Sequence, residues 1–251
     1  MGEIPRQEES LDQAQDGLEI NTLKSEHLAE GVKPIIACVG TKEQYGEQVS
    51  EITQMAVNVD YYADSSNIDE DWYKNEGTRP GYVISAIDEF PKFTEKLYGC
   101  TSLVAVGIDS KTGKEVSFLT HQDSYRTINE PFQKDLEKRL RELKMQCREG
   151  TIDVVIVGGE LNPKKMKAMF YQESLEALSS VVEKSFGFSP VVACGPKEPG
   201  SGFDYDNAYF DTENRRLYMI RPESKNLYND SFNPGQINEV NEKWKRDKLE
   251  K

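Results

Sequence analysis

The fold of this protein is decided by residues 101–121, TSLVAVGIDSKTGKEVSFLTH. The run 101–108 is apolar, and the run 115–121 is rich in residues that favour strands. The six residues between them form a polar turn with Gly113, and glycine tolerates the backbone angles that hairpin turns need. We therefore predict an antiparallel hairpin.

The register of this hairpin brings a cysteine close to a histidine. If the turn is centred near residues 111–112, paired positions have numbers that sum to about 223. His121 then lies opposite Ser102, and Cys100 lies opposite Asp123. Cys100 and His121 are thus diagonal neighbours on one face of the sheet, within the roughly 7–8 Å that separates such pairs. A one-residue bulge would break this arrangement.

Strand and helix signals on both sides of the hairpin predict a single mixed α/β domain over residues 33–222. Apolar runs bounded by turn residues indicate strands, and apolar residues at helical spacing indicate helices. The predicted strands are 34–40, 56–64, 81–87, 152–159 and 189–195, with a second hairpin over 207–221 and helices over 41–55, 130–149 and 164–186. The succession of strand, helix and strand over 152–195 is typical of a βαβ unit with parallel strands.

Polar segments are expected at both ends of this domain. Residues 1–31 are rich in Glu, Gln, Asp and Ser, which is typical of a flexible acidic leader. His27 lies within this leader and is expected to be solvated. Residues 223–251 are expected to form a polar C-terminal tail that contains a short helix.

The composition excludes several classes of function. Lys and Arg total 31 and Asp and Glu total 44, so the formal net charge of the 251 residues is −13. Proteins that bind nucleic acids or anionic membranes normally present a basic face, so neither partner is expected. No stretch has the roughly 18 consecutive apolar residues of a membrane span, and the N-terminus lacks the features of a Sec signal peptide. We expect a soluble protein, either cytoplasmic or a secreted effector.

The chain holds four cysteines and two histidines, which limits the chemistry of a site. The cysteines are widely spaced without a CxxC pair, so no metal site is indicated and no cofactor is expected. A cysteine beside a histidine can act as a nucleophile, because the imidazole takes the thiol proton and the thiolate is the reactive form. Cys100 and His121 are therefore the candidate dyad. The alternative is that Cys100 packs in the core, as most buried cysteines do.

The other residues that could carry chemistry are expected to have structural roles. We expect packing for the cysteines, solvation in a loop for the aspartates because their spacing is not that of an EF-hand, and surface exposure for the arginines. These residues are Cys38, Cys147, Cys194, Asp204, Asp206, Asp211, Arg215, Arg216 and Arg221.

The residues that precede the hairpin, FTEKLYGC (93–100), resemble the nucleophile segment of a superfamily of cysteine deamidases. This superfamily includes the bacterial chemoreceptor glutamine deamidase CheD, the cytotoxic necrotizing factor toxins and the Burkholderia lethal factor. Its pattern is a short motif that ends in cysteine, then a strand, a turn, and a histidine at the end of the next strand. Here these are Cys100 and His121, and the apolar strand that ends in Gly158-Gly159 is similar to one in CheD.

The resemblance implies a fold and a mechanism. The fold would be an α+β sandwich, with a mixed β-sheet core and flanking helices. Thr94 lies six positions before Cys100, as does the threonine that helps to orient the histidine in CheD and the lethal factor. Cys100 would attack a glutamine side chain of a protein substrate, His121 would transfer the protons, and backbone N–H groups at Gly99 and Thr101 would hold the oxyanion. Water would then release glutamate, whereas an amine would give transglutamination.

Three features differ from the family pattern, and other functions stay open. Tyr98-Gly99 stands before Cys100, where CheD usually has a serine. The interval from Cys100 to His121 is longer than expected for the family, which a longer hairpin explains. Residues 1–80 have no counterpart in CheD. The alternative functions are a non-catalytic interaction protein that keeps the fold, and a hydrolase of a small-molecule amide.

Overall fold

The predicted hairpin is present in the computed structural model, which describes residues 21–22, 27–59, 81–97, 100–123, 130–158, 167–193 and 206–221. Strands β6 (Cys100–Ile108) and β7 (Glu115–Asp123) pair in antiparallel fashion. The paired residues, from Cys100 with Asp123 to Ile108 with Glu115, have numbers that sum to 223, so the predicted register is confirmed.

The turn of this hairpin is held by Asp109. Its carboxylate accepts hydrogen bonds from the backbone N–H groups of Thr112 and Lys111, each at 2.8 Å. Together with a bond from the Gln146 side chain, these contacts lower the pKa of Asp109 to about 2. The Asp109 carboxylate therefore stays charged at neutral pH and continues to accept these hydrogen bonds.

One sheet contains the hairpin and has the strand order β4-β7-β6-β8-β9. Its other strands are β4 (Tyr82–Ile84), β8 (Asp153–Gly158) and β9 (Val191–Ala193). Helix α4 (Lys167–Phe186) lies between β8 and β9 in the chain, and these strands are parallel, so the predicted βαβ unit is confirmed. Helix α3 (Glu130–Gln146) ends earlier than predicted, because Cys147 leaves the helix to bridge with Asp109.

A second sheet has the order β1-β2-β11-β10-β5-β3. Its strands are β1 (Asn21–Thr22), β2 (Ile36–Thr41), β3 (Val57–Asn58), β5 (Lys92–Leu97), β10 (Asp206–Asp211) and β11 (Arg216–Arg221), and helix α1 (Lys42–Met55) follows β2. The second predicted hairpin is β10–β11, which is confirmed. Strand β5 was not among the predicted strands, and the division of the strands into two sheets was not predicted.

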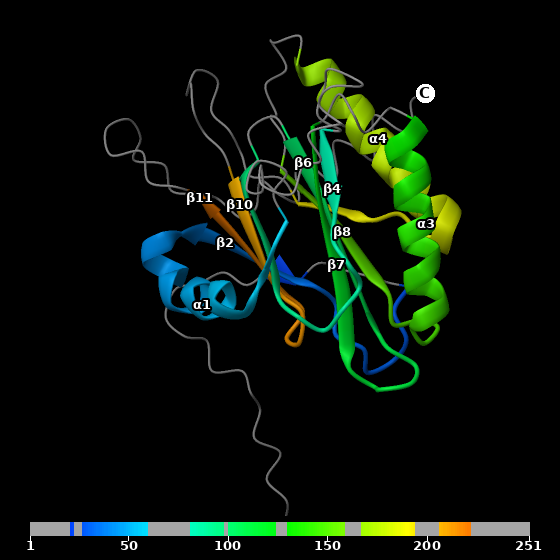
Figure 1. Ribbon diagram of the computed structural model, residues 1–251, viewed down its shortest axis with the longest axis horizontal. Coiled ribbons are helices and arrows are strands. Elements are labelled where there is room, and N and C mark those ends of the chain that lie inside the picture. The colour runs from blue at the N-terminus through cyan, green and yellow to red at the C-terminus, as the bar shows by residue number, and fades with distance from the viewer. Residues whose placement is uncertain are drawn as a thin grey trace, which may run out of the picture.

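The two sheets face each other, and the helices cover their outer faces (Figure 1). Alternation along β6 shows this arrangement: Val104 and Val106 pack between the sheets, whereas Leu103 and Ala105 pack under α3 and α4. Helix α1 covers the other sheet through Tyr45, Val49 and Ile52. The chain is thus a mixed α/β protein, as predicted. None of its described helices is both long and apolar enough to cross a bilayer.

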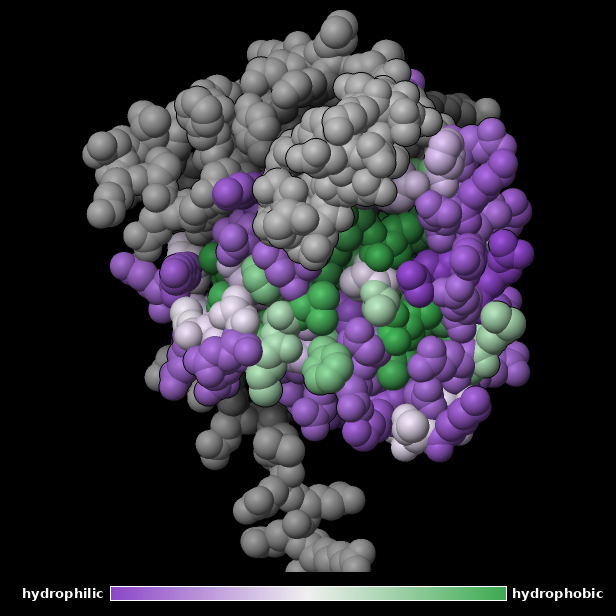
Figure 2. Space-filling view, viewed as in Figure 1, coloured by the Kyte–Doolittle hydropathy of each residue, from purple (hydrophilic) through white to green (hydrophobic). Residues whose placement is uncertain are grey.

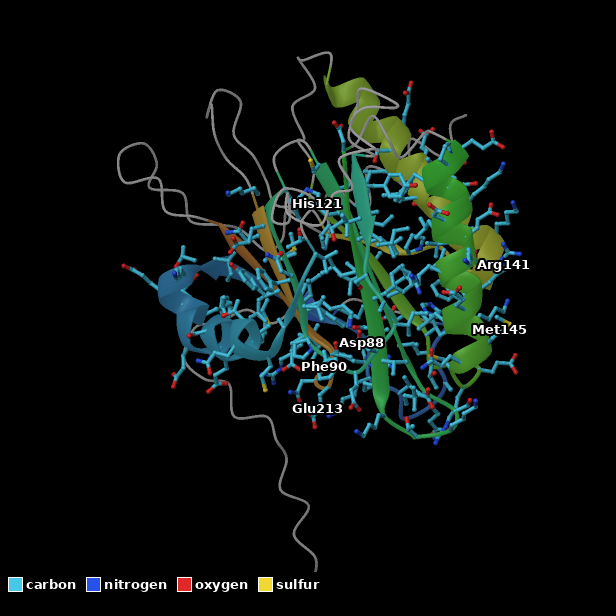
Figure 3. All side chains as sticks on the ribbon, viewed as in Figure 1. Asp88, Phe90, His121, Arg141, Met145 and Glu213 are labelled. Atoms are coloured by element: carbon cyan, nitrogen blue, oxygen red, sulfur yellow. The ribbon has the colours of Figure 1, made fainter. Side chains whose placement is uncertain are left out.

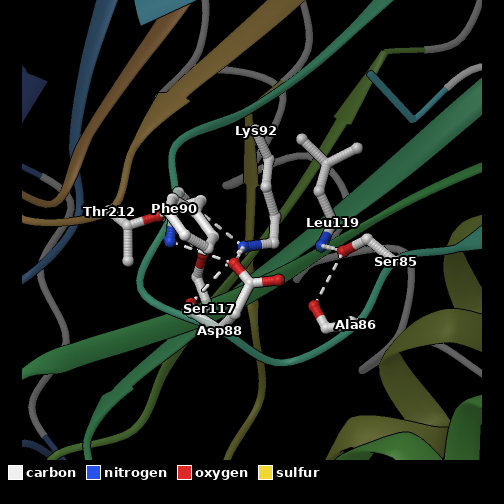
Figure 4. A network of polar contacts seen from close by, with 8 residues as sticks. All are labelled: Ser85, Ala86, Asp88, Phe90, Lys92, Ser117, Leu119 and Thr212. Carbon is white, nitrogen blue, oxygen red and sulfur yellow. Dashed lines mark hydrogen bonds and ion pairs between the residues drawn. The ribbon is translucent and has the colours of Figure 1, made fainter. Parts of the chain in front are cut away.

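The crossover from β4 to β5 links the two sheets and is fixed by a buried lysine (Figure 4). Lys92 Nζ donates to Asp88 Oδ1 at 2.8 Å and to the Phe90 carbonyl at 2.9 Å. Burial lowers the pKa of Lys92, and the hydrogen bond that Lys92 donates to Asp88 opposes this effect. Thr212 also donates to the Phe90 carbonyl, at 2.8 Å. These contacts fix the start of β5, two residues before Thr94.

The expectation that His27 is solvated is wrong. Its ring stacks on Phe188 with 3.4 Å between centroids, and its Nε2 lies 3.0 Å from the Ile152 carbonyl oxygen. The N–H of Ala29 also donates to the Gly150 carbonyl at 2.8 Å. Residues 27–31, which composition assigned to the leader, therefore contact the body. A polar composition does not reveal that one amphipathic ring covers an aromatic surface.

The expectation that Arg215 is a surface charge is also wrong. Its side chain is buried, and its φ of 51° turns it inward at the end of the β10–β11 turn. The neighbouring Arg216 is exposed, as expected. Several other expectations lie outside the described residues: those for residues 1–20, the tail 223–251, Cys194 and Asp204.

Candidate active site

His121 lies between the two sheets and is fully buried (Figure 3). Its Nδ1 is 2.7 Å from Oγ1 of Thr94, which is fully buried in β5 of the opposite sheet. This hydrogen bond fixes the ring and leaves Nε2 as the nitrogen that can exchange a proton with a neighbouring nucleophile. The structure thus brings Thr94 and His121 together, as the resemblance predicted.

Cys100 begins β6 and lies on the same face of its sheet as His121. Because Cys100 pairs with Asp123 and Thr101 pairs with Gln122, the thiol is a diagonal neighbour of the imidazole. Cys100 belongs to the apolar cluster between the sheets and is 7% exposed, whereas His121 has no exposed surface. The cysteine is therefore the member of the pair that a substrate would meet first.

A β-bulge in β5 sets the path of the chain toward Cys100. Thr94 pairs with Ala208 and Leu97 pairs with Asp206, so β5 has one residue more than β10 between these pairs. The extra residue is accommodated at Lys96, which has a φ of 59°. Bulges of this kind often redirect side chains beside active sites. Here the bulge allows both Thr94 and Leu97 to face the interior between the sheets.

A polar network on the helix-facing side supports the two strands that carry the dyad. Gln122 Nε2 donates to Thr101 Oγ1 at 3.0 Å, and Thr101 Oγ1 lies 3.3 Å from Ser174 Oγ of α4. All three residues are buried. Since Thr101 follows Cys100 and Gln122 follows His121, the network fixes the register of β6 and β7 at the dyad. No pattern in the sequence predicts that these side chains meet.

Ser102 is a further residue of this site that sequence reasoning did not select. It lies opposite His121 in the register of the hairpin, two residues after Cys100 and on the same face. Its side chain is fully buried, and within the described part of the chain its Oγ has no hydrogen-bond partner. A buried hydroxyl without a partner is costly, so its presence beside a cysteine and a histidine favours a functional site.

The remaining sequence-predicted residues are placed as follows. Gly99 lies outside the described residues, so its role as an oxyanion donor stays a prediction. Thr101 pairs with Gln122, and its role as an oxyanion donor also stays a prediction. Cys38 and Cys147 are buried, and burial raises the pKa of both thiols, that of Cys147 to about 12. Neither is suited to form a thiolate at neutral pH.

The orienting role of Thr94 can be tested with a variant of nearly the same shape. Thr94→Val removes the hydroxyl, and we expect the rate at which iodoacetamide modifies Cys100 at neutral pH to fall about fivefold, since a hydrogen bond contributes about 1 kcal/mol. Thr94→Ser keeps the hydroxyl and should restore most of the rate. A lower unfolding midpoint in Thr94→Val with an unchanged pH–rate profile of Cys100 would contradict this role.

Within the described residues, no group of three or more His, Cys, Asp or Glu side chains is arranged to hold a metal ion. The described site holds a thiol, an imidazole and a hydroxyl, which together suit nucleophilic attack on a carbonyl group. In the comparisons with known proteins, no family model matches the chain and no curated protein matches its sequence.

Proposed function

We propose that the protein is a cysteine amidohydrolase of the CheD and necrotizing-factor type, which deamidates glutamine side chains of a protein substrate. The observation that carries this proposal is the 2.7 Å contact between Thr94 Oγ1 and His121 Nδ1, beside Cys100. It joins the orienting group in β5 to the base in β7, and the strand register places Cys100 of β6, the proposed nucleophile, diagonally next to the base. The sandwich of two mixed sheets with flanking helices gives further support.

The first half of the reaction forms a thioester. His121 Nε2 takes the thiol proton of Cys100, and the thiolate attacks the carboxamide carbon of the glutamine. In the resulting imidazolium, the Nδ1–H donates to Thr94 Oγ1, which keeps the ring oriented while it is charged. Backbone N–H groups around Gly99 and Cys100 would stabilise the oxyanion. When the tetrahedral intermediate collapses, the C–N bond breaks and the His121 proton leaves with ammonia.

The second half regenerates the enzyme. His121 takes a proton from water, the hydroxide attacks the thioester carbon, and the C–S bond breaks to release glutamate. The proton on His121 returns to the Cys100 thiolate. The burial of His121 between the sheets would limit the access of bulk water during the first half, which favours formation of the thioester.

Mass spectrometry tests this proposal. After incubation of a cell lysate with the native protein, we expect peptides in which one glutamine has gained about one dalton through conversion to glutamate. These peptides should be absent after incubation with Cys100→Ser. Cys38→Ser is the matched control, because Cys38 is also a buried thiol but lies far from the dyad. It packs under α1, on the outer face of the sheet that contains β2. Equal conversion by the Cys100→Ser protein would refute the proposed enzyme.

A further inference from the structure

Strand β4 is an outermost strand of its sheet in the described part of the chain. Its hydrogen bonds to β7 show which of its backbone groups face β7 and which face away. The Ser85 N–H donates to Leu119 O, and the Asp123 N–H donates to Gly81 O. Backbone groups of alternate residues in an antiparallel pair point in opposite directions. The N–H and C=O groups of Tyr82 and Ile84 therefore point away from β7, and no described strand pairs with them.

This edge lacks the features that usually prevent strand pairing. Natural edges are often protected by charged residues or proline. The segment 81–87, GYVISAI, contains neither. Figure 2 shows apolar surface near the centre of this face, next to the hydrophilic surface of α3. The edge of β4 therefore has no residue that would prevent another strand from pairing with it.

A groove runs along this edge, beside α3. It has a volume of about 240 Å³ and is lined by Tyr82, Val83 and Ile84 of β4 and by Asp135, Lys138, Arg139 and Glu142 of α3. The Tyr82 side chain faces the helix, where its hydroxyl donates to Asp135 at 2.8 Å, whereas Val83 packs against the cluster between the sheets. Tyr82 and Val83 thus lie on opposite faces of the sheet, and a groove that contacts both of them must run along the edge of the strand.

Two carboxylates and two cations line the groove, and the place in it that suits an acidic side chain is next to Lys138. Asp135 accepts the Tyr82 hydroxyl, and Arg139 pairs with Glu142 at 2.9 Å. Lys138 is exposed, and the described contacts include no ion pair for it. A carboxylate that enters the groove would therefore find a matching ammonium group at Lys138.

The edge is connected to the candidate site through β7. Val83 pairs with His121, and Asp123 of β7 pairs with Cys100 and bonds to Gly81. The end of β4 at Tyr82 is therefore the end nearer to Cys100. A strand added to β4 would lie about 14 Å from β6, the strand that begins with Cys100, at three strand spacings. Pairing would thus anchor a polypeptide whose next few residues can reach Cys100.

We propose that the groove between β4 and α3 binds an extended, acidic segment of the protein substrate by strand addition, and presents the glutamine that follows it to Cys100. This inference rests on the proposed function, because the occupant is the substrate of the same site. It narrows the substrate class to polypeptides with an unstructured or unpaired extended segment beside the target glutamine.

A peptide-binding measurement tests the anchor without any turnover. The probe is a fluorescent peptide of about twelve residues, with alternating Val and Thr, one Glu and no glutamine, added to the native full-length protein. We expect saturable binding in fluorescence anisotropy. A peptide methylated on four consecutive central nitrogens should bind at least about tenfold more weakly, because it cannot form the strand ladder. Equal binding of the methylated peptide would overturn the proposal.

Protein variants locate the binding at β4. Ile84→Pro removes an N–H that points into the groove, a position where an edge strand tolerates proline. We expect this variant to bind the unmethylated peptide at least about tenfold more weakly than the matched control Ile84→Val. Lys138→Glu should weaken binding of the Glu-containing peptide and strengthen binding of its Glu→Lys counterpart. If Ile84→Pro fails to fold, the comparison of the two peptides on the native protein still decides the outcome.

Other occupants would give different results. Protection of the Tyr82 and Ile84 amides from hydrogen exchange in the monomer without peptide would show that the chain itself covers the edge, and a dimer that Ile84→Pro converts to monomer would show self-association. Either result overturns the proposal. Loss of peptide binding with persistent His121-dependent labelling of Cys100 would refute the groove and leave the proposed function standing. Peptide binding without any Cys100-dependent deamidation would refute the substrate assignment and the proposed function together.

Discussion

His121→Ala should slow the reaction of Cys100 with iodoacetamide at pH 7 by about 30-fold. An ordinary cysteine is only about 3% thiolate at this pH, so a neighbouring imidazole that takes the proton can raise the reactive fraction by up to about 30-fold. In the native protein, labelling should be selective for Cys100 among the described cysteines, because Cys100 has the His121 imidazole as its diagonal neighbour, whereas burial raises the pKa of Cys38 and Cys147. Peptide mapping by mass spectrometry at several reaction times measures each rate.

The control for this experiment is the second histidine of the chain. His27→Ala removes the ring that stacks on Phe188, far in sequence from the hairpin, and should leave the labelling rate of Cys100 unchanged. Slow and equal labelling of all cysteines in the native protein and in His121→Ala would favour the alternative in which Cys100 is a packing residue. A fall of the same size in His27→Ala would indicate a general loss of structure.

Arg215→Met should lower the free energy of unfolding by about 3 kcal/mol, because it removes one partner from a buried charged contact. The Arg215 guanidinium donates to the carbonyls of Lys33 and Thr151, at 2.9 and 2.8 Å. It also forms an ion pair with Glu115 at 2.8 Å. These contacts connect the β10–β11 turn of one sheet with β7 and the start of β8 in the other. Urea unfolding followed by circular dichroism measures the change.

Arg216→Met is the matched control. It makes the same substitution one residue along the chain, but Arg216 is exposed and its change should fall within about 0.5 kcal/mol. Similar midpoints for the two variants would show that the buried arginine does not hold the sheets together. Arg215→Lys should recover only part of the stability, since an ammonium group cannot reproduce the planar fork that reaches two carbonyls and a carboxylate.

The local features of the fold could be predicted from the sequence, because they depend on neighbours along the chain. The turn at Asp109 and the strands beside it determine the register of β6 and β7, which the numbering sum predicted correctly. The βαβ unit and the β10–β11 hairpin were predicted for the same reason. The contact between Thr94 and His121 was predicted only through the family resemblance, since it joins residues of different sheets.

The features that were not predicted depend on packing between distant elements. Lys92 and Glu95 make β5 look polar in the sequence. In the structure, Lys92 is buried and donates hydrogen bonds within the crossover, and Glu95 accepts a hydrogen bond from the Tyr209 hydroxyl. Arg215 and His27 were placed at the surface from their type, and both find partners far along the chain. Periodicity shows which face of a strand is apolar, but it does not show which second sheet covers that face.

The geometry of the β6–β7 hairpin also determines where the molecule can be altered by insertion. Its turn is exposed and lies about 30 Å from Cys100, since β6 begins at Cys100 and has nine residues at roughly 3.3 Å each. A tag or reporter domain placed between Lys111 and Gly113 would leave both strands, and the thiol at their opposite end, in their present alignment. A single residue added inside β6 would instead turn Cys100 to the helix side while His121 stayed in place. For the engineer, the turn is therefore an attachment point, and the strands that join it to the dyad have a fixed length.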